Sequence, residues 1–71
     1  MLGRVKVNEA AILLETSPQF VRVAMQRNIL PIGIAIKMSS SWTYHISPKL
    51  LAEYCGKNVE EEVQKIRMEN N

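Results

Sequence analysis

The sequence contains no aspartate, one cysteine, one histidine and only three glycines among its 71 residues. A single cysteine excludes an intrachain disulfide and is typical of a protein in a reducing compartment. Cys55 and His45 alone are too few for structural zinc, which takes four ligands. There is no glycine-rich phosphate loop, and a chain this short has little room for a pocket around His45. We therefore expect no enzymatic activity, no metal and no cofactor.

Long apolar runs are also missing. The longest, Ile29 to Ile36, contains Pro31 and Gly33 and is far below the roughly 20 residues that a membrane-spanning helix needs. The segment Met1 to Lys6 is too short and too charged for a signal peptide. We expect a cytoplasmic protein without membrane contact.

Acidic side chains are absent between Glu15 and Glu53, and the net charge of +2 is unevenly distributed. Residues 1–58 carry seven basic and three acidic side chains, whereas residues 59–71 carry two basic and four acidic ones. This division predicts a basic domain over residues 1–58, suited to a polyanion, and an acidic C-terminal helix or tail over residues 59–71.

Two helices joined by a short turn are predicted in the first part of the chain. Apolar residues recur at helical spacing from Val7 to Leu14. Ser17 suits an N-cap and Pro18 the first helical position, so a second helix is predicted from about Pro18 to Arg27. Its expected buried face consists of Val21, Ala24 and Met25.

A β-hairpin is predicted next, because two stretches with period-two alternation flank a run of three serines. The first stretch is Ile32 to Met38 and the second is Trp42 to Ile46. We expect the aromatic side chains of the second strand to lie across from Ile34 and Ile36 and to join the core. The alternative is that they stack on bases or insert between them. These aromatic residues are Trp42 and Tyr44, in line with Ile46.

The remainder of the chain predicts one or two further helices. Ser47 and Pro48 repeat the helix-start signal, and Gly56 suits a helix end. The side chains expected to point inward from this third helix are Leu51, Tyr54 and Cys55. Asn58 would cap a fourth helix, with fraying expected from Met68 to Asn71. A short edge strand is also predicted over Arg4 to Val7.

The order of these elements is typical of a mostly α-helical winged helix-turn-helix domain with a small hairpin as its wing. On the second helix, guanidinium and amide groups are suited to reading bases in the major groove. The residues expected to read bases there are Gln19, Arg22 and Gln26, and Arg27 is expected to contact phosphate. On the wing, phosphate contacts are expected from Lys37, Ser39, Ser40 and Ser41. The alternative is that these side chains form an ordinary solvated surface.

The acidic segment allows two interpretations. Glu60, Glu61 and Glu62 can be the solvated face of a helix. Alternatively, they repel DNA and leave a thin apolar stripe free to bind a protein partner. This stripe consists of Val59, Val63 and Ile66.

The runs VNEAAILL (residues 7–14) and TSPQFVR (residues 16–22) resemble the helix-turn-helix of the MerR-like and excisionase families. Residues 29–48 look like the hairpin region of small DNA-binding proteins from phages and integrative elements, and the resemblance covers residues 5 to about 55. It implies a winged-helix excisionase, or recombination directionality factor, in a bacterial host cell. The matching positions place Ser17, Gln19, Arg22 and Gln26 on the DNA-binding recognition helix and Lys37 to Ser41 in the wing. Such proteins bind repeated sites, bend attachment-site DNA and assist a tyrosine or serine integrase, often with self-association on the DNA.

Other functions share this small fold. The chain lacks the long coiled coil of the MerR regulators, which argues against a ligand-sensing activator. A small phage transcriptional regulator or repressor remains an alternative. So does a phage-encoded inhibitor that binds a host protein through a helix-turn-helix scaffold, because fold does not determine function.

Overall fold

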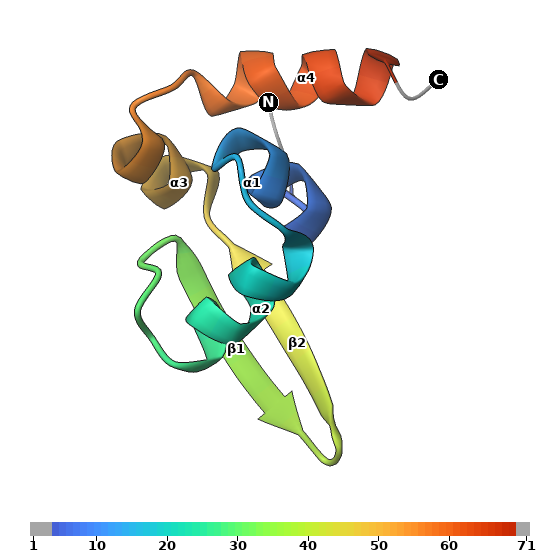
Figure 1. Cartoon of the computed structure of the whole chain (residues 1–71), viewed down its shortest axis with the longest axis vertical. Coiled ribbons are helices and arrows are strands. Elements are labelled where there is room, and N and C mark those ends of the chain that lie inside the picture. Colours follow the sequence, from blue (N-terminus) through green and yellow to red (C-terminus); the bar gives the residue numbers. More distant parts are fainter. Residues whose placement is uncertain (1–3, 70–71) are drawn as a thin grey trace.

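The computed structural model describes residues 4–69 as four helices and one two-stranded antiparallel sheet (Figure 1). In chain order the elements are α1 (Val7–Leu13), α2 (Pro18–Gln26), β1 (Gly33–Met38), β2 (Ser41–Ile46), α3 (Pro48–Cys55) and α4 (Val59–Glu69). This mixed architecture agrees with the expected class. Of the predicted frayed end, Met68 and Glu69 belong to α4, and the last two residues lie outside the described range.

The helix boundaries follow local capping. Ser17 and Ser47 each accept a hydrogen bond from the amide three residues later, at 3.1 and 3.2 Å, and each is followed by a proline. Gly56 ends α3 with a φ of 71°, a left-handed conformation that glycine adopts without strain. Asn58 caps α4 through its side-chain oxygen, which accepts from the amide of Glu61 at 3.1 Å. The structure confirms all four capping signals.

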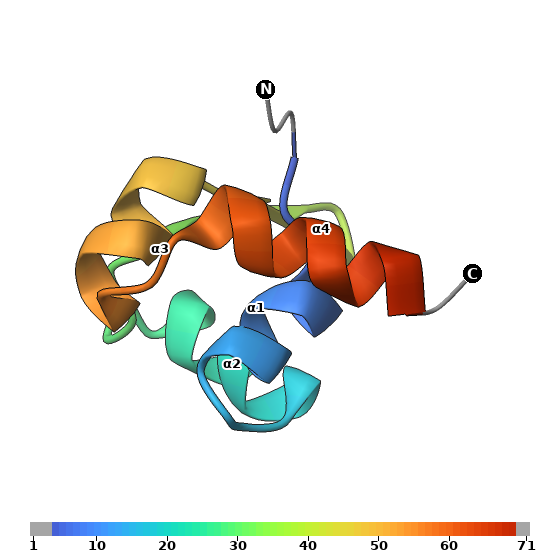
Figure 2. The same cartoon turned by 90° about the horizontal axis from the view of Figure 1, so that it is seen from above.

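One hydrophobic core joins all four helices to the base of the hairpin, and α4 crosses over α1 and α3 when seen from above (Figure 2). The predicted buried face of α2 is confirmed. The buried apolar residues are Val5, Ala10, Ala11, Leu13, Val21, Ala24, Met25, Leu30, Ile32, Ile46, Leu51, Val59 and Val63. Burying a large aliphatic side chain contributes about 1.5–3 kcal/mol, so this shared core holds α4 firmly to the rest of the chain.

The hairpin register differs from the expected one. Trp42 pairs with Lys37 and Tyr44 with Ala35, so neither aromatic residue lies across from an isoleucine of β1. The expected pairing assumes a loop of three serines, whereas the structure has a two-residue turn at Ser39–Ser40. Shifting a strand by one residue exchanges its two faces, which is the physical reason for the error.

As a result, β1 exposes apolar side chains on its outer face. Ile34, Ile36 and Met38 are 56%, 39% and 65% exposed. Of the expected core residues in β2, Ile46 is buried, Tyr44 is half-buried and packs against the core, and Trp42 is exposed. The hairpin therefore projects from the core.

Two further predictions, one on Tyr54 and one on the N-terminal strand, are corrected by the structure. Tyr54, expected to point inward from α3, is exposed, because the buried stripe of this eight-residue helix follows Leu51 and the half-buried Cys55. The predicted strand at Arg4 to Val7 is reduced to a single bridge between Val5 and Ile46, since the chain is already helical from Val7.

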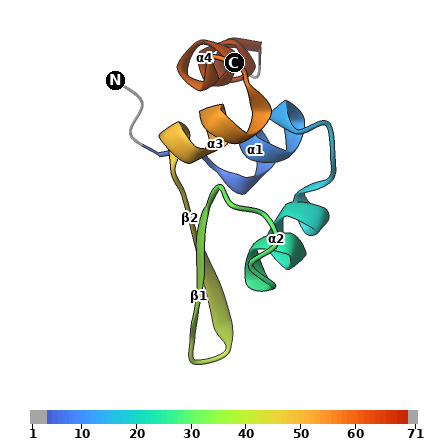
Figure 3. The same cartoon turned by 90° about the vertical axis from the view of Figure 1, so that its left-hand side faces the viewer.

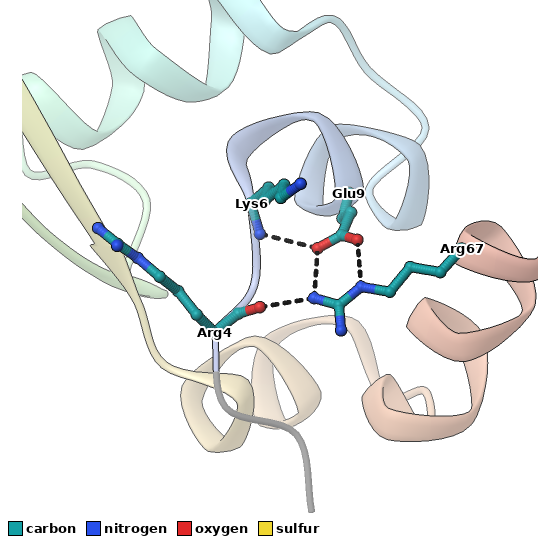
Figure 4. Close-up of polar contacts among 4 residues, drawn as sticks. All are labelled: Arg4, Lys6, Glu9 and Arg67. Atoms are coloured by element: carbon teal, nitrogen blue, oxygen red, sulfur yellow. Dashed lines mark hydrogen bonds and ion pairs between the residues drawn. The ribbon is translucent and has the colours of Figure 1, made fainter. Parts of the chain in front are cut away.

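A buried carboxylate connects α1 to α4 (Figure 4). Glu9 is only 6% exposed, and its two oxygens accept from the Nε and an Nη of Arg67 at 2.7 and 3.2 Å. The same Nη donates to the carbonyl of Arg4 at 2.7 Å. The amide of Lys6 donates to Glu9 at 2.9 Å, which caps the start of α1. Arg67 thus fastens the last helix to the first.

The electrostatics of this pair favour the charged forms. Burial alone would raise the pKa of Glu9, but the hydrogen bonds from Arg67 and from the Lys6 amide outweigh it and hold the pKa below its ordinary value of 4.5. The bond to Glu9 in turn raises the pKa of Arg67. Because the folded-state pKa of Glu9 is depressed, its contribution to stability is present above pH 4.5 and is lost as the pH falls through the folded-state value.

We predict that Glu9→Gln lowers the free energy of unfolding by about 1–2 kcal/mol at neutral pH, because it removes a charge-assisted hydrogen-bond acceptor. The difference from the natural chain should shrink as the pH drops below 4.5. Urea denaturation at several pH values measures both effects. Glu53→Gln, at an exposed position of α3, is the matched control and should cause little change. A deficit that stays constant down to acidic pH would contradict this account.

Candidate nucleic-acid interface

The candidate interface lies at the end of the molecule opposite α4. In Figure 3 the hairpin projects downward beside α2, and α4 lies across the top. The body measures 34 Å along its longest axis. Because α4 carries four of the seven acidic side chains, the negative charge gathers at one end, away from α2 and the hairpin tip.

The side chains predicted to read bases share one stripe of α2. Gln19, Arg22 and Gln26 are three and four residues apart, which places them on one face of the helix. Gln19 is exposed and Arg22 is half-buried. Arg27, the C-cap residue, is exposed on the neighbouring stripe with Phe20. The buried face of α2 turns the other way, so the polar stripe is left on the surface.

The positive charges of this region are unpaired. Among residues 4–69, neither Arg22, Arg27 nor Lys37 has an ion-pair partner. By contrast, Lys65 on α4 lies 3.7 Å from Glu61 and 3.6 Å from Glu62. The cations of α2 and the hairpin therefore remain available to an anionic ligand.

A hydrogen bond that the sequence did not predict joins α2 to the hairpin. The side-chain amide of Gln26 donates to the phenol oxygen of Tyr44 at 2.6 Å. This contact spans 18 residues in the chain and depends on the strand register, so no local pattern could have revealed it. Gln26, predicted to read bases, also holds the helix and the hairpin in a fixed relation.

The predicted serine contacts differ in their surroundings. Ser17 is exposed, and its oxygen is already engaged in capping α2. Ser39, Ser40 and Ser41 form the exposed hairpin tip, where Ser39 has a φ of 58°. A positive φ at only the first of two turn residues fits the type II′ turn common in hairpins. Small hydroxyl side chains at such a tip allow close approach to a ligand.

The predicted partner stripe on α4 is not available. Val59 and Val63 are 3% and 0% exposed and belong to the common core, and Ile66 packs against it. The expectation of an exposed apolar stripe is wrong, because the same spacing that makes a stripe also lets α4 cover α1 and α3. Residues 59–69 therefore belong to the same packed body as residues 4–58.

The surface offers little else for chemistry. In the described part of the chain, no three His, Cys, Asp or Glu side chains lie together as metal ligands would, and no helix is long and apolar enough to cross a membrane. Comparison with protein-family models, with characterised proteins and with solved structures finds no match. Any function assigned to this surface therefore depends on its geometry and charge.

We predict that Tyr44→Phe lowers the free energy of unfolding by about 1 kcal/mol, because it removes the acceptor for Gln26 and leaves the ring in place. Chemical denaturation measures the change. Tyr54→Phe makes the same substitution at an exposed tyrosine without a hydrogen bond among the described residues, and should be neutral. Equal effects at both positions would show that the bond between α2 and the hairpin adds nothing to stability.

Proposed function

We propose that this protein is a winged helix-turn-helix DNA-binding protein without catalytic activity. In this proposal α1 and α2 are the helix-turn-helix, α2 enters the major groove, and the hairpin is the wing that contacts the sugar-phosphate backbone. Arg22 and Gln19 read base edges, while Arg27, Lys37 and the tip serines contact phosphates.

One observation carries the proposal. The exposed polar stripe of α2 and the projecting hairpin share one end of the molecule, carry unpaired cations, and come from the acid-free stretch between Glu15 and Glu53. A solvated helix ordinarily mixes charges of both signs. The concentration of unpaired positive charge next to a thin ribbon is the arrangement that a duplex requires.

For the biological role we propose an excisionase, acting in the cytoplasm of a bacterial host. It would bind attachment-site DNA, bend it, and help a tyrosine or serine integrase, with further copies of itself on adjacent sites. The support is the resemblance of residues 7–22 to the excisionase helix-turn-helix and of residues 29–48 to the hairpin region of phage DNA-binding proteins. An inhibitor acting through the α4 stripe is set aside, because Val59 and Val63 are buried.

We predict that Arg22→Ala weakens binding to the specific site about ten- to a hundredfold, the value of one bidentate base contact. Lys65→Ala removes the same charge from the opposite end, where Lys65 pairs with its own helix, and should change affinity less than about twofold. Mobility-shift titrations on DNA from around the protein's own gene measure both. If the two variants lose affinity equally, α2 is not the reading helix.

We predict a strong salt dependence. If about five basic groups neutralise phosphates, log affinity falls against log salt concentration with a slope near −4.5. Titrations at several salt concentrations give the slope, and circularly permuted fragments of the same DNA report bending. Bending of attachment-site DNA supports the excisionase role, whereas unbent binding at a promoter alone supports a transcriptional regulator. Absence of binding to any duplex at low salt would overturn the DNA-binding proposal.

A further inference from the structure

A groove follows the outer edge of β2, on the side away from β1. It has a volume of about 390 Å³ and is formed by the extended N-terminal segment and the hairpin. Its lining residues are Arg4, Val5, Lys6, Val7, Trp42, Thr43 and Tyr44. The bridge between Val5 and Ile46 holds the two walls together at one end. One end of the groove is therefore anchored by backbone pairing.

The chemistry of the groove is basic and aromatic. None of the lining residues is acidic, and two are exposed cations, Arg4 and Lys6. The nearby carboxylate of Glu9 is bound by Arg67. Trp42, a residue that is 37% exposed, contributes its indole, and its partner across the hairpin is Lys37. A lining with two cations and an aromatic wall suits a ligand that is anionic and partly apolar, as a sugar-phosphate chain is.

The backbone and the side chain of Arg4 have different roles. Its carbonyl accepts from Arg67 at 2.7 Å, which anchors the segment to α4. Its side chain extends toward β2 (Figure 4), and among residues 4–69 the guanidinium has no partner. Because the Arg4 carbonyl is already anchored, binding of an anion has to order the side chain but not this part of the backbone.

The groove adjoins the proposed DNA-binding surface. Tyr44 lines the groove and also accepts the hydrogen bond of Gln26 on α2. A DNA strand bound at α2 can thus extend past Tyr44 into the groove along β2. It meets no acidic residue there, because none lines the groove. Resting on the proposed function, we propose that this groove binds the sugar-phosphate backbone of the same duplex, with Arg4 contacting a phosphate and Trp42 packing against the chain.

The test uses the single tryptophan of the chain, Trp42, as a fluorescent reporter. A short mixed-sequence duplex is titrated into the protein at several salt concentrations, because phosphate contacts do not depend on sequence. Duplex binding should alter the Trp42 emission. Arg4→Gln should weaken binding about fivefold at low salt and make the salt slope shallower by about 0.9. Arg4→Lys should restore most of the slope, and Lys65→Gln is the control that should leave it unchanged.

Separate outcomes decide the two proposals. The Arg4→Gln loss should be the same for specific and mixed-sequence duplexes, unlike the loss caused by Arg22→Ala. Circular dichroism melting should be unchanged, since the carbonyl of Arg4 is retained. If the natural chain binds DNA but Arg4→Gln leaves slope, affinity and emission unaltered, the groove proposal fails and the DNA-binding proposal stands. If no duplex binds, both fail. Emission that changes with protein concentration in the absence of DNA, together with an Arg4→Gln variant whose salt slope is unchanged, would assign the groove to a second copy of the chain and overturn the DNA assignment.

Discussion

The ion pair between Glu9 and Arg67 determines where the charges of this small protein lie. A carboxylate that is 6% exposed needs a partner, and the partner stands 58 residues further along the chain. Because Arg67 satisfies it and also reaches the carbonyl of Arg4, α4 is held across the end of the body opposite the hairpin. The acidic residues of α4 are thereby kept away from the cations of α2. Charge separation here is a result of packing.

The hydrophobic core also holds α4 and α2 on opposite sides of the protein. Val59 and Val63 enter the cluster that also buries Val21 and Met25 of α2, so one apolar body carries α4 on one side and α2 on the other. In a chain of this size a single core rarely provides more than about 3–5 kcal/mol of stability. Pairing a buried charge and capping each helix are therefore substantial contributions, and the N-terminal segment serves both.

Local capping signals predict where the helices begin and end. The hairpin register and the packing of α4 depend on contacts between distant parts of the chain, which these signals do not reveal. Ser17, Ser47, Gly56 and Asn58 act within one turn of the chain, so their roles could be predicted from neighbouring residues alone. The hairpin was predicted, but its register depends on whether the loop has two or three residues. The period-two alternation of apolar residues in the two strands is compatible with either loop length. The hydrogen bond from Gln26 to Tyr44 follows from that register. Whether the apolar stripe of α4 is exposed or buried depends on its packing against α1 and α3. These features are set by tertiary contacts that no single stretch of sequence encodes.

The hydrogen bond between Gln26 and Tyr44 also has a mechanical consequence. It links α2 to the hairpin, so a change in the spacing between the helix and the hairpin has to break this bond. If α2 and the hairpin both contact one duplex, the duplex would have to bend or twist to fit them. Sequences with easily unstacked pyrimidine–purine steps would then be favoured without any base being touched at those steps. Under the proposed function, target choice would then depend partly on how readily the double helix deforms.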